Sequence, residues 1–460
     1  MKLPNGPQSP AVLQMLRWIT SPMSFMETCA KRYGDMFTIR LDSKSPPLIF
    51  VSKPEVLEQI LTNDTKGLEA PGDTNAVFES LLGKHSVITI SGAEHQRQRQ
   101  LLLPPFHGER MRSYSQIISD ITEKVISQYQ IGQPFNIRSV TQAITLRVIM
   151  QAVFGLDEGP RAEKLQHCLA EMLEKGSSVL SAALLYFPAL QRDFGPINFW
   201  GKQMRRQQAA DKLIYEEIRE RQEQPDPSRT DILSLLMAAR DEAGQAMTDE
   251  ELRDELMTLL VAGHETTATA LAWAFYWIQK IPSVRQKLLQ ELDSLGDNPD
   301  PGTIFKLPYL NAVCSETLRI YPVAMLTFAR VVRTPLSLGG YELEPGIGVI
   351  GSIYLTHHRE DLYPEPKQFK PERFLERQFS PYEYLPFGGG ARRCIGLAFA
   401  QLEMKLALAK ILSTRELELV DNGDVRPKRR GLVTGQDRPI QMVVTSQRQV
   451  KSPILQTTTV

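Results

Sequence analysis

One proline-free stretch with a helical pattern, from Thr248 to Ile281, constrains the fold of this chain more than any other feature. Thr248 and Glu251 have the spacing of a capping box, and Met247 and Leu252 have the spacing of a hydrophobic staple. About 33 residues with a rise of 1.5 Å each make a rod of about 50 Å, long enough to cross the whole molecule. The sequence therefore predicts a mainly helical protein with one long central helix.

Shorter patterns indicate a minor β component. Two apolar runs, Met36–Leu41 and Leu48–Val51, flank a turn sequence with two prolines and predict a β-hairpin. From about Pro54 the chain is predominantly helical, and apolar residues that share one face predict a second helix over Tyr309–Ile320. Turn signals between residues 338 and 347 separate the short strands of a small second sheet. The fold class that follows is mainly α with a small β portion.

The number of domains follows from the length and from what interrupts the chain. A length of 460 residues gives a prior of about three domains. No Pro/Gly/Ser-rich linker, low-complexity tract or internal repeat divides the sequence, and 42% hydrophobic residues can fill one large core. We therefore expect residues 1–460 to form a single domain, with peripheral tails over about residues 1–25 and 446–460.

Charge, cysteine content and hydropathy exclude several classes of protein. Lys+Arg and Asp+Glu both number 53, so no global charge steers the chain to nucleic acid or an anionic membrane, although local patches can still act. The four cysteines are far apart, which argues against a disulfide framework or zinc site and favours a reducing cytoplasm. No stretch reaches the roughly 18 apolar residues that span a bilayer, and there is no signal-peptide core. We expect a soluble cytoplasmic protein with at most weak peripheral membrane association.

The segment from Phe387 to Gly396 places one cysteine where a thiolate can act as a nucleophile or a metal ligand. Its three consecutive glycines allow backbone conformations and close approaches that a β-carbon forbids. Arg392 and Arg393 precede Cys394 and a helical pattern follows it, a setting that lowers the pKa of a thiol. A glycine-rich turn with an incidental buried cysteine is the simpler alternative. The complete spacing Phe-x-x-Gly-x-Arg-x-Cys-x-Gly, however, resembles the haem-thiolate signature of the cytochromes P450.

This resemblance runs from roughly residue 30 to residue 440 and implies the cytochrome P450 fold, with the long helix over the haem. It implies haem b as the cofactor and O₂ as the co-substrate, with Cys394 as the axial ligand of the iron. A thiolate in that position donates electron density to the iron and favours cleavage of the O–O bond.

In the middle of the long helix lies the sequence Ala-Gly-His-Glu-Thr-Thr, Ala262–Thr267. Glycine costs up to about 1 kcal/mol relative to alanine inside a helix, and such local conflicts are expected where function overrides stability. The segment resembles the P450 oxygen-binding motif, which implies that Glu265 feeds protons toward the distal pocket and that Thr266 organises their delivery. The structural alternatives are a Thr266 hydroxyl bonded to a carbonyl one turn earlier and a solvated Glu265. His264 is at the variable position of the motif and is expected to be structural.

A third motif is Glu-x-x-Arg on the second predicted helix. Glu316 and Arg319 are within ion-pairing reach, and by themselves they would be a surface pair worth a few tenths of a kcal/mol, about 0.2–0.5 kcal/mol. With Arg373, in the sequence Pro-Glu-Arg-Phe, they resemble the buried Glu-Arg-Arg triad of the P450 family. The resemblance implies that these three residues stabilise the scaffold behind the haem and take no part in the chemistry.

The two carboxylates of a haem need cationic or hydrogen-bond donating partners. His95 and Arg99 are four residues apart on one predicted helix face, in the pattern His-x-x-x-Arg that contacts haem propionates in some bacterial P450s; an exposed basic turn is the alternative. His358 matches a histidine that assists in some members. The candidate cofactor-binding residues implied by the resemblance are His95, Arg99, Arg330, Phe387, Arg392 and Gly396.

These motifs predict a haem-thiolate monooxygenase that inserts one oxygen atom from O₂ into a hydrophobic substrate. Three other classes remain as alternatives: a haem-thiolate peroxygenase, a haem-thiolate isomerase or dehydratase, and a haem-based gas sensor. Each of these has less need of the acid–threonine pair. The chain carries no Gly-x-Gly-x-x-Gly element or cysteine-rich iron–sulfur segment, so electrons from NAD(P)H must come through a separate ferredoxin and its reductase or through a flavodoxin.

The substrate is predicted from three apolar segments at family substrate-contact regions. They are Ser177–Ala189, which lies where the family has its mobile lid, Val323–Leu326 and Leu432–Thr434. Ordinary core packing is the alternative for each of them. The candidate substrate contacts are Val323, Leu326 and Val433. The overall resemblance is to bacterial P450s that hydroxylate long-chain fatty acids near the chain end, and a terpenoid such as a sesquiterpene is the second candidate substrate.

Overall fold

The computed structural model of the protein describes residues 3–42, 45–64, 67–156, 159–176, 198–296, 299–431 and 433–448. Its α-helices are α1 (Ala11–Thr20), α2 (Pro22–Tyr33), α3 (Pro54–Thr62), α4 (Glu79–Leu82), α5 (Gly92–Leu102), α6 (Arg110–Ile126), α7 (Ile137–Phe154), α8 (Pro160–Gly176), α10 (Phe199–Glu223), α11 (Ile232–Ala238), α12 (Asp249–Lys280), α13 (Pro282–Asp293), α14 (Pro301–Phe305), α15 (Pro308–Ile320), α16 (Ile353–His357), α17 (Arg373–Glu376) and α18 (Leu397–Thr414). Short 3₁₀ helices cover Asp73–Phe78, Pro104–Phe106 and Gly390–Arg392.

The strands are short and scattered among these helices. They are β1 (Met36–Ile39), β2 (Leu48–Val51), β3 (Leu68–Glu69), β4 (Pro134–Asn136), β5 (Arg330–Val332), β6 (Leu336–Leu338), β7 (Tyr341–Leu343), β8 (Gly348–Gly351), β9 (Arg415–Leu419), β10 (Pro427–Arg430), β11 (Val433–Gln436) and β12 (Gln441–Gln447). The predicted class, mainly α with a small β portion, is confirmed.

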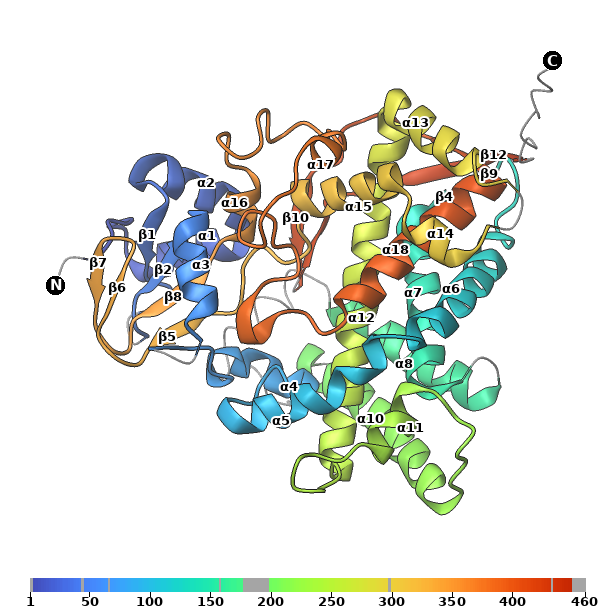
Figure 1. The fold of residues 1–460 in the computed structure, drawn as a ribbon, viewed down its shortest axis with the longest axis horizontal. Helices are drawn as coiled ribbons and strands as arrows, with labels where there is room; N and C mark the ends of the chain where they lie inside the picture. Colours follow the sequence, from blue (N-terminus) through green and yellow to red (C-terminus); the bar gives the residue numbers. More distant parts are fainter. Residues whose placement is uncertain are drawn as a thin grey trace, which may run out of the picture.

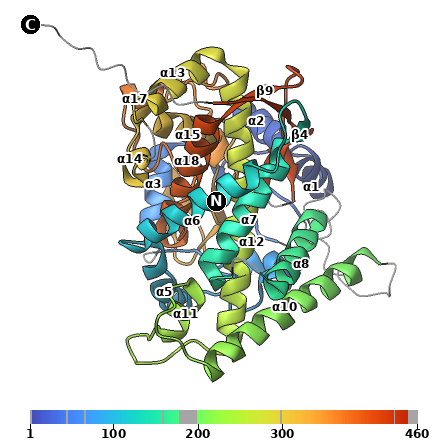
Figure 2. The ribbon, with the colours of Figure 1, turned by 90° about the vertical axis from the view of Figure 1, so that its right-hand side faces the viewer.

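Helix α12 runs through the middle of the molecule in both ribbon views (Figures 1 and 2). The predicted capping box is present: the N–H of Glu251 donates to Oγ1 of Thr248 at 3.2 Å, and the N–H of Thr248 donates to Oε2 of Glu251 at 2.7 Å. Met247 and Leu252, the two residues of the predicted staple, are both buried. Helices α7, α10, α15 and α18 all pack against α12. The central helix is therefore the element around which the helical part is assembled.

The largest sheet lies at one end of the molecule, apart from most of the helices (Figure 1). Its strand order is β1-β2-β8-β5-β3. Strands β1 and β2 form the predicted antiparallel hairpin, which pairs Met36 with Val51 and ends at Ile39 rather than Leu41. Strands β6 and β7 form a separate two-stranded sheet, in which Gly339 and Gly340 make the turn with φ of 57° and 84°. The small second sheet that the turn signals predicted is therefore present.

The N-terminal segment departs from the tail expected before residue 25. Its described part forms α1 and the start of α2, and Trp18 and Phe25 are buried against Phe37 and Phe50 of the hairpin. Trp18 and Phe50 meet edge to face, with ring centroids 5.7 Å apart. Large aromatic side chains contribute much of the energy of such a core, so this segment is part of the fold.

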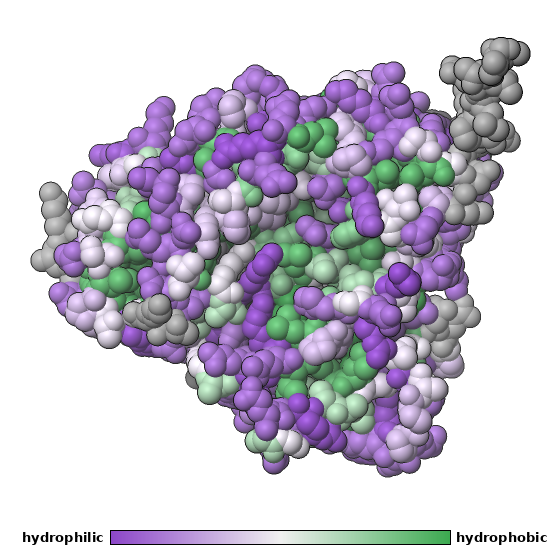
Figure 3. All heavy atoms as spheres, in the orientation of Figure 1, coloured by the Kyte–Doolittle hydropathy of each residue, from purple (hydrophilic) through white to green (hydrophobic). Residues whose placement is uncertain are grey.

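On the face drawn in Figure 3, hydrophilic residues lie around the edge and hydrophobic residues gather toward the middle. None of the helices in the described ranges combines the length and the apolar composition needed to cross a membrane.

Candidate active site

The cysteine loop folds back on itself just before α18. The N–H of Cys394 donates to the carbonyl of Phe387 at 3.0 Å, which closes the loop that the three glycines form. Gly388 and Gly390 have φ of 66° and 67°, a conformation that side chains other than glycine rarely adopt. A β-carbon on Gly390 would also collide with the carbonyl oxygen of Leu61, at 2.7 Å. Gly388 is therefore favoured by its φ alone, whereas Gly390 is required both by its φ and by the closeness of the end of α3.

The Cys394 thiol has accessible surface although it lies deep within the fold. Burial raises its pKa, and this effect exceeds the lowering by a hydrogen bond from the backbone of Gly396 and by the charges of Arg99 and Arg393. The expected lowering of the thiol pKa is therefore wrong for the polypeptide alone, because desolvation disfavours the thiolate. A metal ion bound at this sulfur would supply the positive charge that these neighbours lack, since a coordinating thiol is deprotonated outright.

Cationic side chains named from the sequence converge beside this loop. Burial lowers the pKa of Arg392 to about 10, and the neighbouring charge of Arg330 adds to the effect. Burial also lowers the pKa of His95 to about 4, and the charges of Arg392 and Arg99 contribute. Asp64 is a carboxylate in this cluster and pairs with Arg330, Oδ1 to Nε, at 2.9 Å. Glu69, the other carboxylate that acts on Arg392, is paired with Arg333. The three arginines and Asp64 therefore leave two positive charges, which a group with two carboxylates would neutralise.

Two of the side chains in this cluster, Arg330 and Arg392, already donate hydrogen bonds to protein atoms, whereas His95 and Arg99 do not in the described part of the chain. Arg330 donates to Asp64 and to the carbonyl of Gly389 at 2.9 Å, and Arg392 donates to four backbone carbonyls. In the described part of the chain, the side chains of His95 and Arg99 have no hydrogen bond or ion pair to another residue. Because a neutral histidine still carries one N–H, both side chains can donate to an external anion.

Gly396 gives an independent indication of a group that binds here. Its φ is −82°, a conformation open to every residue, and a β-carbon built on it meets no atom within 4 Å. The polypeptide itself therefore gives no steric reason for glycine two residues after Cys394. A flat cofactor against the loop would give one. The donor sulfur, the excess positive charge and this open space together fit a haem.

The motif on α12 combines a buried side with an accessible one. Ala262 is exposed, although His264 and Glu265 in the next turn are buried. Gly263 lies against α7, where an added β-carbon would come within 3.0 Å of Cδ1 of Ile149. The helix is continuous here, and Oγ1 of Thr266 donates to the carbonyl of Ala262 at 2.5 Å. This is the bond to the preceding turn that the sequence left open as the structural alternative.

Glu265 is not on a solvated helix face. One carboxylate oxygen pairs with the guanidinium of Arg138 at the start of α7, and Oε2 accepts from Nε2 of Gln142 at 3.1 Å. Arg138 also donates to Oγ1 of Thr269 at 3.1 Å. His264 is buried and hydrogen-bonded through Nδ1 to Thr145 at 2.8 Å, and burial lowers its pKa to about 4, in agreement with a structural role. Arg138 and Gln142 could not be identified from the sequence because they are more than 120 residues from Glu265.

A second acidic residue near this motif was also missed. Glu403, on α18, is 1% exposed, and burial raises its pKa well above the usual value, although a hydrogen bond from Thr267 opposes the shift. Thr267 follows Thr266 directly, and Glu403 is in the second turn of the helix that begins just after Cys394. Glu403 is six residues after Leu397, a rise of only about 9 Å along the helix. The cysteine loop and the threonines of α12 are therefore in the same part of the molecule.

The structure brings the three residues of the third motif together. Glu316 accepts from Nε of Arg319 at 2.6 Å and from Nε of Arg373 at 3.2 Å, and neither Glu316 nor Arg319 has any exposed surface. Backbone groups complete the cluster: the N–H of Lys370 donates to Glu316 at 2.8 Å, and Arg319 donates to the carbonyl of His357 at 2.7 Å. The pair is thus buried and not a surface pair.

Two of the predicted substrate segments meet each other. The N–H of Thr434 donates to the carbonyl of Val323 at 2.9 Å, and the indole N–H of Trp273 on α12 donates to the carbonyl of Thr434 at 3.3 Å. Val323 and Val433 are buried, and Leu326 is half-buried. The lid segment, residues 177–189, lies outside the described residues.

His358 is not placed with the cations beside the cysteine loop. Its Nδ1 is bonded to the carbonyl of Tyr354 at 2.8 Å, and its ring packs on that of Tyr354. Burial lowers its pKa to about 4, and the nearby charge of Arg319 adds to the shift. The expectation that His358 assists at the propionates is therefore not supported by its position.

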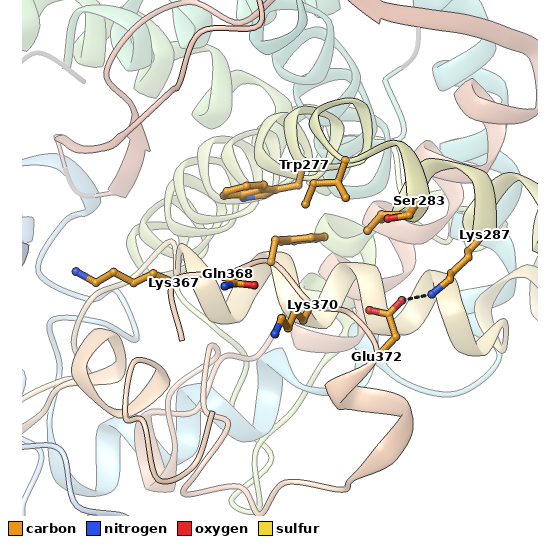
Figure 4. Close-up of a pocket in the computed structure, with 10 residues that line it drawn as sticks. Trp277, Ser283, Lys287, Lys367, Gln368, Lys370 and Glu372 are labelled. Carbon is orange, nitrogen blue, oxygen red and sulfur yellow. Dashed lines mark hydrogen bonds and ion pairs between the residues drawn. The ribbon is translucent and has the colours of Figure 1, made fainter. Parts of the chain in front are cut away.

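A cavity of about 590 Å³ opens elsewhere, between the end of α12, α13 and the segment before α17 (Figure 4). Its lining includes Trp277, Val284 and Phe369, and none of the residues predicted for the active site. Lys287, which also lines it, is paired with Glu372 at 2.8 Å. This cavity is separate from the site built around Cys394.

Comparison with known proteins identifies relatives over almost the whole chain. The family model described as Cytochrome P450 matches residues 4–444. The chain is 34% identical to the putative cytochrome P450 135B1 of Mycobacterium tuberculosis over 453 residues, which cover 98% of this chain and 93% of the relative. It is 32% identical to the putative cytochrome P450 138 of the same organism over 440 residues, 94% of each chain.

Solved structures show the same fold. The retinoic acid-bound cyanobacterial CYP120A1 superimposes with a TM-score of 0.83 at 25% identity, over 97% of this chain and 100% of that one. The haem domain of cytochrome P450DA superimposes with a TM-score of 0.84 at 24% identity, over 97% and 98% of the two chains.

Proposed function

The chain belongs to the cytochrome P450 family of monooxygenases, which are oxidoreductases that use haem and O₂, and we propose that this member hydroxylates a long apolar substrate. The preferred substrate is a long-chain fatty acid, oxidised near the end of its chain. A terpenoid is the second candidate, because retinoic acid, the ligand named for the cyanobacterial structure, is itself an isoprenoid acid.

In this proposal the protein binds the haem both through its iron and through its two propionates. Cys394 binds the iron, and His95, Arg99, Arg330 and Arg392 face the two propionates. Phe387 closes the cysteine loop through its carbonyl, and Gly396 leaves room for the plane of the macrocycle. When bound, the haem supplies the activation of O₂ and the transfer of one oxygen atom to the substrate.

Glu265 and Thr266 are proposed to deliver the protons. Arg138 and Gln142 hold the Glu265 carboxylate on the α7 side of α12, while the Thr266 hydroxyl points to the Ala262 carbonyl on the accessible side. A proton that passes from Glu265 to Thr266 therefore requires a side-chain rotation that exchanges at least one of these bonds. The Arg138 pair keeps the carboxylate oriented until that rotation takes place.

The observation that supports an apolar substrate is the contact between residues 323–326 and β11 beside α12. The hydrogen bond between Thr434 and Val323 fixes two apolar segments side by side, and Trp273 joins them to α12. Val323, Leu326 and Val433 would then offer hydrocarbon surface to a substrate above the haem. Each methylene buried contributes about 0.8 kcal/mol, so binding should tighten several-fold per added CH₂ until the site is full.

A spectral titration with a graded series of fatty acids, fatty alcohols and sesquiterpenes tests this proposal. We expect the low-to-high-spin shift to strengthen with chain length and then level off, with acids and alcohols of equal length within about tenfold of each other, or about 1.4 kcal/mol. Tight, productive binding of a compact terpene, with no response to chain length, would overturn the fatty-acid proposal in favour of the terpenoid. Turnover with a ferredoxin system and O₂, set against turnover with peroxide alone, separates a monooxygenase from a peroxygenase.

Cys394→Ser should abolish the red-shifted Soret band of the reduced carbon monoxide complex, because serine cannot donate a thiolate. Cys29→Ser, Cys168→Ser and Cys314→Ser are the controls and should keep the band. Burial raises the thiol pKa of Cys29 to about 11 and that of Cys314 to about 12. Retention of the band in Cys394→Ser would remove this residue as the ligand.

Electrons are proposed to come from NAD(P)H through a separate ferredoxin or flavodoxin. Arg393 is exposed and directly precedes the cysteine, so an acidic partner protein would be attracted to this side. Such attraction mainly raises the association rate and is screened by salt. Reduction rates should therefore fall as ionic strength rises, and rates independent of salt would contradict this mode of docking.

A further inference from the structure

Helix α1 exposes an apolar face and buries a polar side chain. Val12, Leu13 and Leu16 are 69%, 50% and 51% exposed, and we refer to these three residues as the α1 outer face. They are one and four residues apart, so they form one stripe on the helix. Gln14, in contrast, is 1% exposed, and its Oε1 accepts from the backbone N–H of Arg40 at 3.0 Å. Since Trp18 and Ile19 are also buried, α1 has apolar side chains on both its buried and its exposed side, whereas an amphipathic surface helix normally exposes a polar face.

Within the described ranges, the α1 outer face is also the one place where such residues gather. The other large hydrophobic side chains with comparable exposure in the described ranges are Ile131, Met204, Leu375 and Val420, and each lies in a different part of the chain. Single exposed hydrophobic residues are normal on a protein surface, whereas adjacent ones mark a surface that another molecule covers.

The charges around this face are positive. Residues 1–26 contain no aspartate or glutamate, and the first acidic residue, Glu27, is paired with a lysine at 2.8 Å. Arg17 is exposed in the last turn of α1, and Arg40 is exposed next to the buried Gln14. Arg429, on β10, lies against the buried side of α1: its guanidinium is 5.6 Å from the ring centre of Trp18 and donates to the Trp18 carbonyl at 3.4 Å. This surface therefore has hydrophobic residues at its centre and arginines at its edge.

We propose that the α1 outer face binds the surface of an anionic lipid bilayer. Val12, Leu13 and Leu16 enter the boundary between headgroups and acyl chains, and the arginines contact the lipid phosphates. Helices that lie in a membrane interface have this combination, and each cation near an anionic surface adds to the binding. A second copy of this chain is a poorer occupant, because two α1 outer faces in contact would bring the same arginines together.

This proposal does not depend on the identity of the substrate, but the α1 outer face is connected through β10 to a candidate substrate contact. Strand β10, which carries Arg429, pairs with β11, which carries the substrate candidate Val433. The proposed lipid contact and the proposed substrate contact are therefore joined by one two-stranded sheet. A bilayer at this face would be close to the part of the enzyme that receives an apolar substrate.

Co-sedimentation of the haem-loaded full-length protein with vesicles tests the proposal. We expect binding to vesicles of phosphatidylglycerol and phosphatidylcholine, and at least tenfold weaker binding to phosphatidylcholine alone or in 1 M salt, where the screening length is about 3 Å. The double variant Leu13→Gln, Leu16→Gln should lose at least tenfold in apparent affinity, and Arg17→Glu should lose several-fold.

A matched control is available elsewhere on the surface. The double variant Leu375→Gln, Val420→Gln removes two side chains that are 50% and 51% exposed, almost the same as Leu13 and Leu16, and should bind vesicles like the unmodified protein. Thermal melting and haem content show that every variant is folded. No sedimentation with anionic vesicles, or equal loss in both double variants, would overturn the proposal. A change from dimer to monomer in Leu13→Gln, Leu16→Gln, without vesicle binding by the parent, would assign the face to self-association instead.

Discussion

Two buried glutamates in this protein have different surroundings, although each pairs with arginine. Behind the cysteine loop, Glu316 accepts from Arg319 and Arg373 and from a backbone N–H, and Arg319 is fixed in turn by a backbone carbonyl. In the middle of α12, Glu265 has one arginine, Arg138, and the other contacts of this pair are to side chains. Glu316 has no exposed surface, whereas Glu265 retains 9%.

The difference shows how one type of ion pair can serve two purposes. Backbone partners cannot move without unfolding the segments that carry them, so the Glu316 cluster can only act as scaffold. The partners of Glu265 are side chains on two helices, and one turn away the surface at Ala262 is accessible. Rotamer changes there need no backbone rearrangement. The first pair should therefore control stability and the second should control proton delivery.

The largest expected effect comes from the first pair. Glu316→Gln keeps the shape of the side chain but leaves Arg319 and Arg373 buried without a counter-charge, which should cost about 3–5 kcal/mol of unfolding free energy. Denaturant unfolding of the haem-loaded protein measures this loss. A loss below about 1 kcal/mol, the value for exposed pairs, would contradict the scaffold role.

Breaking the second pair should cost less stability but change the chemistry. Arg138→Met leaves the Glu265 carboxylate without its cation, and we expect a loss of about 1–3 kcal/mol, because the carboxylate can turn toward the accessible side. Product formed per NAD(P)H consumed should fall at the same time. Arg221→Met is the matched control, since Arg221 is 7% exposed against 8% for Arg138 and pairs with Asp231 at 2.5 Å on other helices. Arg221→Met should lose stability without a change in the product formed per NAD(P)H consumed. An equal product yield per NAD(P)H in both variants would show that the Arg138 pair is only structural.

A third buried carboxylate, Glu403, extends the comparison because no cation pairs with it in the described ranges. Its folded pKa is raised, so the folded state holds a proton that the unfolded state releases above about pH 4.3, the reference pKa of glutamate. Stability then decreases as pH rises through the window between the unfolded and folded pKa values. Glu403→Gln keeps an acceptor for Thr267 and should remove this pH dependence. The difference in unfolding free energy between variant and parent should increase from pH 4 to pH 7, and a constant difference would contradict the assignment.

The smallest change in stability is expected at Thr266. Thr266→Ala removes the hydroxyl that donates to Ala262, but alanine is the better helix former, so the unfolding free energy should stay within about 0.5 kcal/mol. Product formed per NAD(P)H should nevertheless fall, with the difference recovered as peroxide. Unchanged coupling would remove Thr266 from proton delivery and leave only its bond to the preceding turn.

The parts of the fold that could be predicted from the sequence are those that depend on neighbouring residues. The capping box at Thr248, the hairpin from Met36 and the glycine loop before Cys394 all have local signals, and the structure contains each of them. The arginine that holds Glu265 could not be predicted, because it lies 127 residues away on another helix. The predicted lowering of the Cys394 pKa was also wrong. The effect of burial depends on the whole fold and exceeds that of the adjacent arginines.

The contacts of Arg392 have a consequence for the order in which the enzyme matures. Its guanidinium donates to the carbonyls of Ala70, Val87 and Ile90, which are 322, 305 and 302 residues earlier in the chain. Contacts between such distant residues form slowly, and a chain emerging from the ribosome cannot make them until its final part is available. Cys394, the proposed ligand of the iron, lies in the same late segment. If Cys394 binds the iron, haem insertion is therefore expected to follow synthesis of nearly the whole polypeptide.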